Sequence, residues 1–105
     1  MRAFQRDRMR VNVSPSLCQY IVDIVHATRG HAGVALGASP RAALALQRAI
    51  QASAILAGRE YATPDDVKRL APFVLAHRLI LHGESSDSRP AESVVHHILS
   101  EVAVP

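Results

Sequence analysis

The sequence predicts an all-α domain of four helices, with at most one short two-stranded β ribbon beside them. Three of the expected helices begin at a Ser-Pro or Thr-Pro pair, in which the hydroxyl residue caps the helix and proline takes its first position. Apolar residues recur at helical spacing after each pair. Aromatic residues make up only 4% of the 105-residue chain and tryptophan is absent, so we expect an aliphatic, alanine-rich core.

The first two predicted helices are separated by a loop that contains several glycines. They cover about residues 14–29 and 39–58, and each ends at a glycine. The second helix is apolar on two sides, because its main apolar face ends with Leu56 while Leu44 and Ile55 lie among its polar residues. We therefore expect an exposed apolar patch on this helix when the chain is alone.

The third predicted helix has the clearest start in the sequence. Thr63 supplies the cap and Pro64 the first helical position. Asp65 and Asp66 place two carboxylates in the first turn, where the helix dipole favours negative charge. Pro72 lacks a backbone N–H and is expected to break or kink this helix.

The last part of the chain predicts a strand, a flexible segment and a fourth helix. Residues 78–81 are expected to be extended and to pair with residues 11–13 as the β ribbon. Residues 83–90, G-E-S-S-D-S-R-P, are predicted to be flexible. The fourth helix is predicted over about residues 91–102, with apolar positions at helical spacing.

Composition and charge exclude several classes of protein. Cys18 is the sole cysteine, so no disulfide framework or cysteine-based zinc site is expected, and a reducing cytoplasm is the expected location. No apolar run approaches the roughly 18 residues of a membrane span. The net charge of +3 is small, and four of the 12 basic residues fall within residues 1–10, so nucleic acid is not an expected partner. The six histidines lack the spacing of a metal site, and we expect no bound metal.

The candidate binding residues lie at the start of the second helix, in the segment Gly37–Ala42. Ser39 and Pro40 mark a helix N-terminus, whose free N–H groups and positive dipole end attract anions. Arg41 adds a permanently charged guanidinium to the same turn, where a cation is otherwise unfavourable. A solvated surface arginine is the alternative, and the residues by themselves favour it slightly.

Five short motifs follow one another along the chain. They are A-T-R, G-A-S-P-R-A, G-R-x-Y-x-T-P-D-D-V, L-A-P and H-R-L-I-L, at residues 27–29, 37–42, 58–67, 70–72 and 77–81. Together they resemble the C-terminal lid of the MoxR-type AAA+ ATPases. The resemblance extends over about residues 5–105, and it is the combination of motifs that makes it specific.

The resemblance implies a helical lid that packs over ATP held by a separate ATPase core. Arg41 matches the family's sensor-2 arginine, which contacts the γ-phosphate, and Ser39 and Pro40 belong to the same ATP-binding segment. The complete protein would use ATP and Mg²⁺, assemble as a ring, expected to be a hexamer, and remodel or mature protein complexes. Proteins with a von Willebrand factor A domain are its expected partners.

The sequence departs from the family because it contains no catalytic core. No G-x-x-x-x-G-K-[ST] phosphate loop and no strand ending in paired acidic residues occur in it, so the chain alone is expected to retain neither ATP nor Mg²⁺. We interpret residues 1–10 as a basic linker from the missing core and residues 11–105 as the lid. The alternatives are a stand-alone helical protein-interaction module and, less favoured, a histone-fold-like DNA binder.

Overall fold

The computed structural model describes residues 11–81 and 89–105, and it confirms a mainly helical fold with one short ribbon. The elements in chain order are α2 (Pro15–Gly30), β1 (Val34–Leu36), α3 (Pro40–Leu56), α4 (Pro64–Ala76), β2 (Ile80–Leu81) and α5 (Arg89–Glu101). The predicted linker over residues 1–10 and most of the predicted flexible segment lie outside the described residues. None of the described helices is long and apolar enough to cross a bilayer.

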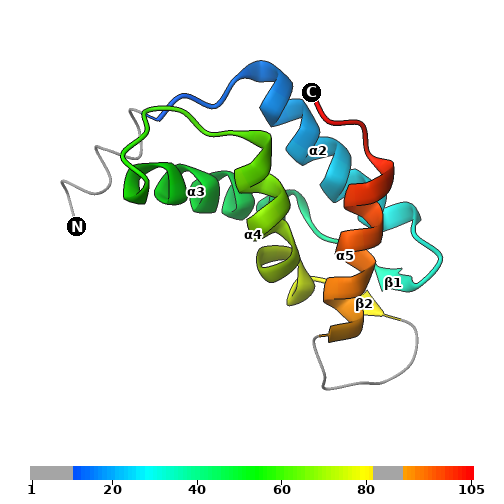
Figure 1. Cartoon of the computed structure of the whole chain (residues 1–105). Coiled ribbons are helices and arrows are strands. Elements are labelled where there is room, and N and C mark those ends of the chain that lie inside the picture. The colour runs from blue at the N-terminus through cyan, green and yellow to red at the C-terminus, as the bar shows by residue number, and fades with distance from the viewer. Residues whose placement is uncertain (1–10, 82–88) are drawn as a thin grey trace.

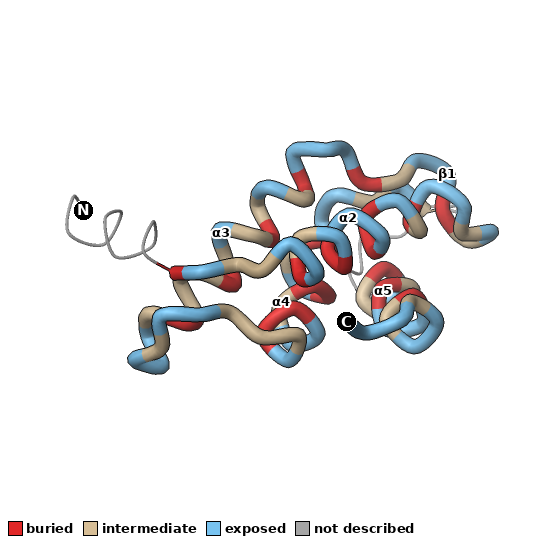
Figure 2. Tube along the Cα trace, turned by 90° about the horizontal axis from the view of Figure 1, so that it is seen from above, coloured by how far each residue is buried: buried red, intermediate tan, exposed pale blue. Residues whose placement is uncertain are grey.

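The helices share one core, which each of them reaches with one side. Helix α4 packs against both α3 and α5, and α2 also packs against α3 and α5, as Figure 1 shows. The ribbon of β1 and β2 lies at one end of the domain, beyond the end of α2. Buried positions repeat along the inward sides of the helices, while the outward sides are exposed (Figure 2).

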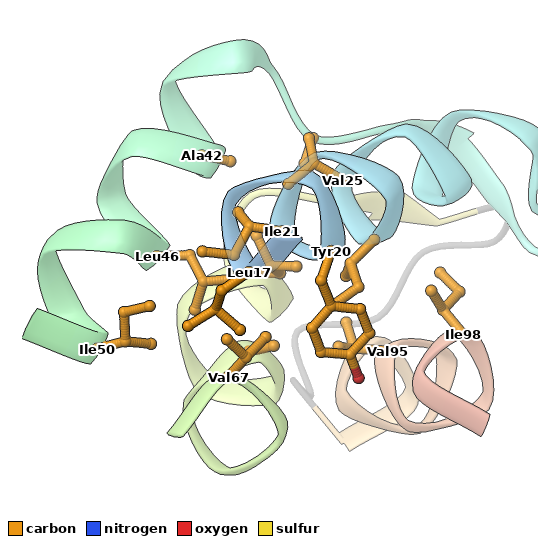
Figure 3. Close-up of a cluster of buried hydrophobic side chains, with 14 residues drawn as sticks. Leu17, Tyr20, Ile21, Val25, Ala42, Leu46, Ile50, Val67, Val95 and Ile98 are labelled. Atoms are coloured by element: carbon orange, nitrogen blue, oxygen red, sulfur yellow. The ribbon is translucent and has the colours of Figure 1, made fainter. Parts of the chain in front are cut away.

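Aliphatic side chains from all four helices fill the core, as the composition predicts. Tyr20 is the largest fully buried side chain, and it reaches from α2 toward Val95 and Ile98 of α5 (Figure 3). Burial raises the pKa of its hydroxyl, which has no hydrogen-bond partner among the described residues. The main aliphatic members of the core are Leu17, Ile21, Ile24, Leu46, Ile50, Val67, Leu75, Val95 and Ile98.

Helix α3 is exposed at two of its leucines. Leu44 is 46% exposed, as predicted, whereas Ile55 is partly buried. Leu56 was expected on the buried face but is 85% exposed. It is the last residue of α3, and the chain then turns at Gly58, where a φ of 73° favours glycine. Leu56 therefore lies beyond Ala54, the last fully buried residue of α3.

Pro72 was expected to break or kink the third helix, and no break occurs. Helix α4 continues past it to Ala76, and Pro72 is itself buried together with Ala71 and Leu75. A proline removes one backbone hydrogen bond, but α4 is held on two sides by α3 and α5. Packing of the apolar face outweighs the lost bond.

The ribbon forms, but its predicted partner strand is wrong. Strand β2 pairs antiparallel with β1, so that Leu36 lies opposite Ile80. Residues 34–36 were expected in a loop because glycines flank them, yet these glycines border a strand. Asn12 instead forms a parallel bridge with Tyr61: its N–H donates to the Glu60 carbonyl at 2.7 Å, and its carbonyl accepts from the Ala62 N–H at 3.0 Å.

Candidate functional site at the start of helix α3

The first turn of α3 has an uncapped N-terminus. Ser39 occupies the N-cap position with extended backbone angles, but its side chain accepts no hydrogen bond from the helix. The hydroxyls of Ser14 and Thr63, by contrast, accept from the Leu17 N–H at 3.1 Å and from the Asp66 N–H at 3.3 Å. The capping bond expected of Ser39 is therefore absent. Pro40 has no N–H and the Ala42 N–H donates to the Ser39 carbonyl at 2.9 Å, so the Arg41 N–H is the group of this turn left open to another acceptor.

Arg41 lies in this first turn with its side chain exposed to solvent. Within residues 11–81 and 89–105 it makes no ion pair and no side-chain hydrogen bond. Ser39 and Pro40 are exposed beside it. Leu44, one helical turn further on, is also exposed, so a cation and an apolar side chain share one accessible side of α3. The three predicted site residues, which are consecutive in the chain, thus form one exposed turn.

The segment that leads into α3 is fixed to the end of α2 by a buried hydroxyl. Thr28, which is fully buried, donates its hydroxyl to the Val25 carbonyl at 2.6 Å. The same oxygen accepts the Ala38 N–H at 2.9 Å. The carbonyl of Ala38 in turn accepts from Nε of Arg29 at 3.3 Å. Both polar groups of Ala38 are therefore held by two neighbouring residues of α2.

Gly37 allows this close approach between the two segments. A Cβ at position 37 would stand 2.8 Å from both the N and the Cα of Arg29, closer than Cβ atoms come to backbone. The motifs A-T-R and G-A-S-P-R-A are therefore in direct contact. This contact was not predicted, because the glycines between the first two helices were expected only to form a loop. The one signal in the sequence was the short spacing of the two motifs.

We expect Gly37→Ala to destabilise the domain by about 1–3 kcal/mol, because the added methyl group forces the backbone away from Arg29. Gly30→Ala is the matched control, since a Cβ there meets nothing within 4 Å and the residue ends α2. It should leave stability unchanged or raise it by about 0.4–1 kcal/mol. Urea denaturation of both variants measures the difference, and equal midpoints would contradict the close approach at Gly37.

A second polar cluster joins the connection after α3 to the first turns of α4. The guanidinium of Arg59 donates to both carboxylate oxygens of Asp66, at 3.0 and 2.9 Å, and Arg69 also contacts this carboxylate at 3.2 Å. Asp66 accepts the Thr63 N–H at 2.9 Å and completes a capping box. The Asp66 side chain is only 3% exposed, so this cluster is a structural clamp and its carboxylate is closed to solvent.

The pKa of Asp66 reflects this clamp. Burial by itself would raise the pKa, but the hydrogen bonds from Arg59 and Thr63 favour the carboxylate more strongly, so the pKa lies below its ordinary value. The motif G-R-x-Y-x-T-P-D-D therefore stabilises the connection between two helices.

Two of the six histidines form a small contact between the α2–β1 loop and α5. The rings of His31 and His97 meet edge to face with centroids 5.5 Å apart. Nδ1 of His31 accepts the Gly33 N–H at 3.0 Å, and Nε2 of His97 lies 3.0 Å from a carboxylate oxygen of Glu101. No group of three metal-ligating side chains occurs in the described part of the chain.

Comparison with known proteins identifies the fold and its relatives. The family described as "AAA lid domain" matches residues 26–98. The uncharacterized protein YeaC of Bacillus subtilis is 47% identical over 102 residues, which cover 96% of this chain and 32% of that protein. Chaperone MoxR1 of Mycobacterium tuberculosis is 38% identical over 103 residues, covering 89% of this chain and 27% of the relative.

A solved structure has the same fold. The crystal structure of a putative ATPase from Cytophaga hutchinsonii superimposes with a TM-score of 0.84 at 32% sequence identity. The alignment covers 96% of this chain and 34% of the ATPase chain. The present chain thus spans about a third of the length of the proteins that it matches.

Proposed function

Because this chain belongs to the AAA lid domain family, as the lid region of a MoxR-type AAA+ ATPase, we propose that it closes over ATP bound to an ATPase core. Arg41 contacts the γ-phosphate in this proposal, and Ser39 and Pro40 form the adjoining wall of the nucleotide site. The observation that carries it is the exposed, unpaired Arg41 guanidinium, within the described residues, on a helix N-terminus that lacks its side-chain cap. Both features favour a bound anion.

The exposed apolar residues near Arg41 support a covering core. Leu44 is 46% exposed, and Leu36, in the strand just before α3, is 61% exposed. Leu44 lies one turn from Arg41 on the same exposed side of α3, and exposed apolar side chains that gather on one surface mark interaction sites. An ATPase core that covers this side of α3 would bury Leu44 and bring phosphate to Arg41.

The complete protein, in the same proposal, hydrolyses ATP with Mg²⁺ in the cytoplasm and acts as a ring, with six copies expected. It remodels or matures protein complexes together with partners that carry a von Willebrand factor A domain. The relative named a chaperone supports this class of activity. The core supplies the phosphate loop and the metal ligands, while this chain supplies Arg41.

ATP turnover by the complete ATPase tests the proposal. Arg41→Ala should lower turnover strongly, whereas Lys68→Ala should leave it unchanged, because Lys68 is an exposed cation on a different helix, α4. Equal turnover in the two variants would overturn the assignment of Arg41.

The 105-residue chain alone should not hydrolyse ATP and should bind it weakly. One arginine at a helix start cannot replace the converging N–H groups, lysine and metal ion of a phosphate-binding site. Phosphate release is to be compared with a protein-free control, and nucleotide binding measured by calorimetry. Hydrolysis above the control by pure material would contradict this expectation.

A further inference from the structure

The position of Arg41 depends on the end of α2 through Thr28 and Arg29. Ala38 is the residue that these two side chains hold, and it precedes Arg41 by three positions. Its own side chain is fully buried, so it cannot shift without disturbing the core. The hydroxyl of Thr28 has no spare hydrogen, because it already donates to Val25.

These contacts fix the direction in which α3 begins. The Ser39 side chain caps no N–H of the helix. The N–H and carbonyl of Ala38 are therefore the polar groups just before α3 that are bonded to another helix. A displacement of this unit moves the first turn of α3 and the base of the Arg41 side chain with it. An arginine that must meet a phosphate oxygen tolerates little such movement, since a shift of about 1 Å can cost about 100-fold in rate.

Resting on the function proposed above, we propose that Thr28, assisted by Arg29, is a positioning residue for Arg41. Its buried hydroxyl holds the Ala38 N–H so that the guanidinium is directed to the γ-phosphate. Thr28 touches no substrate in this role and acts only through the start of α3. A residue needed only for folding would lower the amount of active protein, whereas a positioning residue lowers kcat through Arg41.

The test is a double-mutant cycle in the complete ATPase, read as kcat and KM for ATP. Thr28→Val keeps the shape and removes the hydroxyl, and it should lower kcat about 10-fold to 100-fold. In an Arg41→Ala background it should lower kcat less than about 2-fold, because the positioned group is gone. Thr28→Ser, which restores the hydroxyl, should stay within about 2-fold of the unmodified enzyme.

Two further variants separate positioning from folding. Ile98→Val alters another buried side chain, but on α5, and should leave kcat unchanged. Arg29→Ala alters an exposed residue, so it replaces Thr28→Val in the test if that variant does not fold. It should lower kcat only when Arg41 is present.

If Arg41→Ala has no effect on turnover, both the proposed function and the positioning role of Thr28 fail. If Arg41→Ala lowers turnover while Thr28→Val and Arg29→Ala leave it unchanged, or lower it equally in both backgrounds, only the positioning role is overturned.

Discussion

Replacing Arg41 with alanine should lower ATP turnover of the complete ATPase by about 1,000-fold or more, the scale of arginine contacts in phosphoryl transfer. A guanidinium on the γ-phosphate stabilises charge that develops as the bond breaks, so kcat should fall more than the affinity for nucleotide. The effect should be confined to function, because Arg41 is exposed and its loss leaves no cavity.

The stability of the lid gives the control for this variant. Arg41→Ala removes a cation from the positive end of the α3 dipole, so the free energy of unfolding should stay within about 0.5 kcal/mol or rise slightly. Steady-state hydrolysis and thermal unfolding are measured on the same variant. A destabilised domain would make Arg41 a structural residue, and unimpaired turnover would assign the phosphate contact to another group.

Asp66→Asn should lower the free energy of unfolding by about 1–3 kcal/mol, because the buried carboxylate loses its charge and weakens its hydrogen bonds from Arg59 and Thr63. Asp65→Asn changes the neighbouring residue of the same helix turn, which is exposed, and should cost far less. Urea denaturation at neutral pH measures both variants. Equal losses would show that helix-dipole effects outweigh the clamp.

The clamp also predicts how stability depends on pH. The pKa of Asp66 is lower in the folded chain than in the unfolded chain, because the hydrogen bonds from Arg59 and Thr63 outweigh the effect of burial. Its contribution is therefore complete above the ordinary carboxyl pKa and is lost as the pH falls from there through the folded pKa. Asp66→Asn should flatten this acid decline, while Asp65→Asn should retain it.

The sequence predicts the helices well because their starts are local. The caps at Ser14 and Thr63 depend on residues three positions away, and both form as expected. The continuation of α4 through Pro72 and the pairing of β2 with β1 depend on packing between distant segments, which no local pattern contains. The hydrogen bond from Ala38 to Thr28 joins residues ten positions apart. The sequence therefore indicated Ser39, Pro40 and Arg41 as a site, but not the contacts that fix the segment before them.

The contacts of Val11 and Asn12 join the start of the described chain to the end of α3 and the connection after it. Asn12 is bonded to the connection after α3, at Glu60 and Ala62, and Gln51 near the end of α3 donates to the Val11 carbonyl at 3.4 Å. Arg41 lies at the opposite end of this helix of 17 residues, which at 1.5 Å per residue is about 25 Å long. A rotation of α3 by about 5° around its bridged end would therefore displace Arg41 by about 2 Å. The contacts of Thr28 and Arg29 with Ala38 oppose such a rotation, so polar contacts hold the helix at both of its ends.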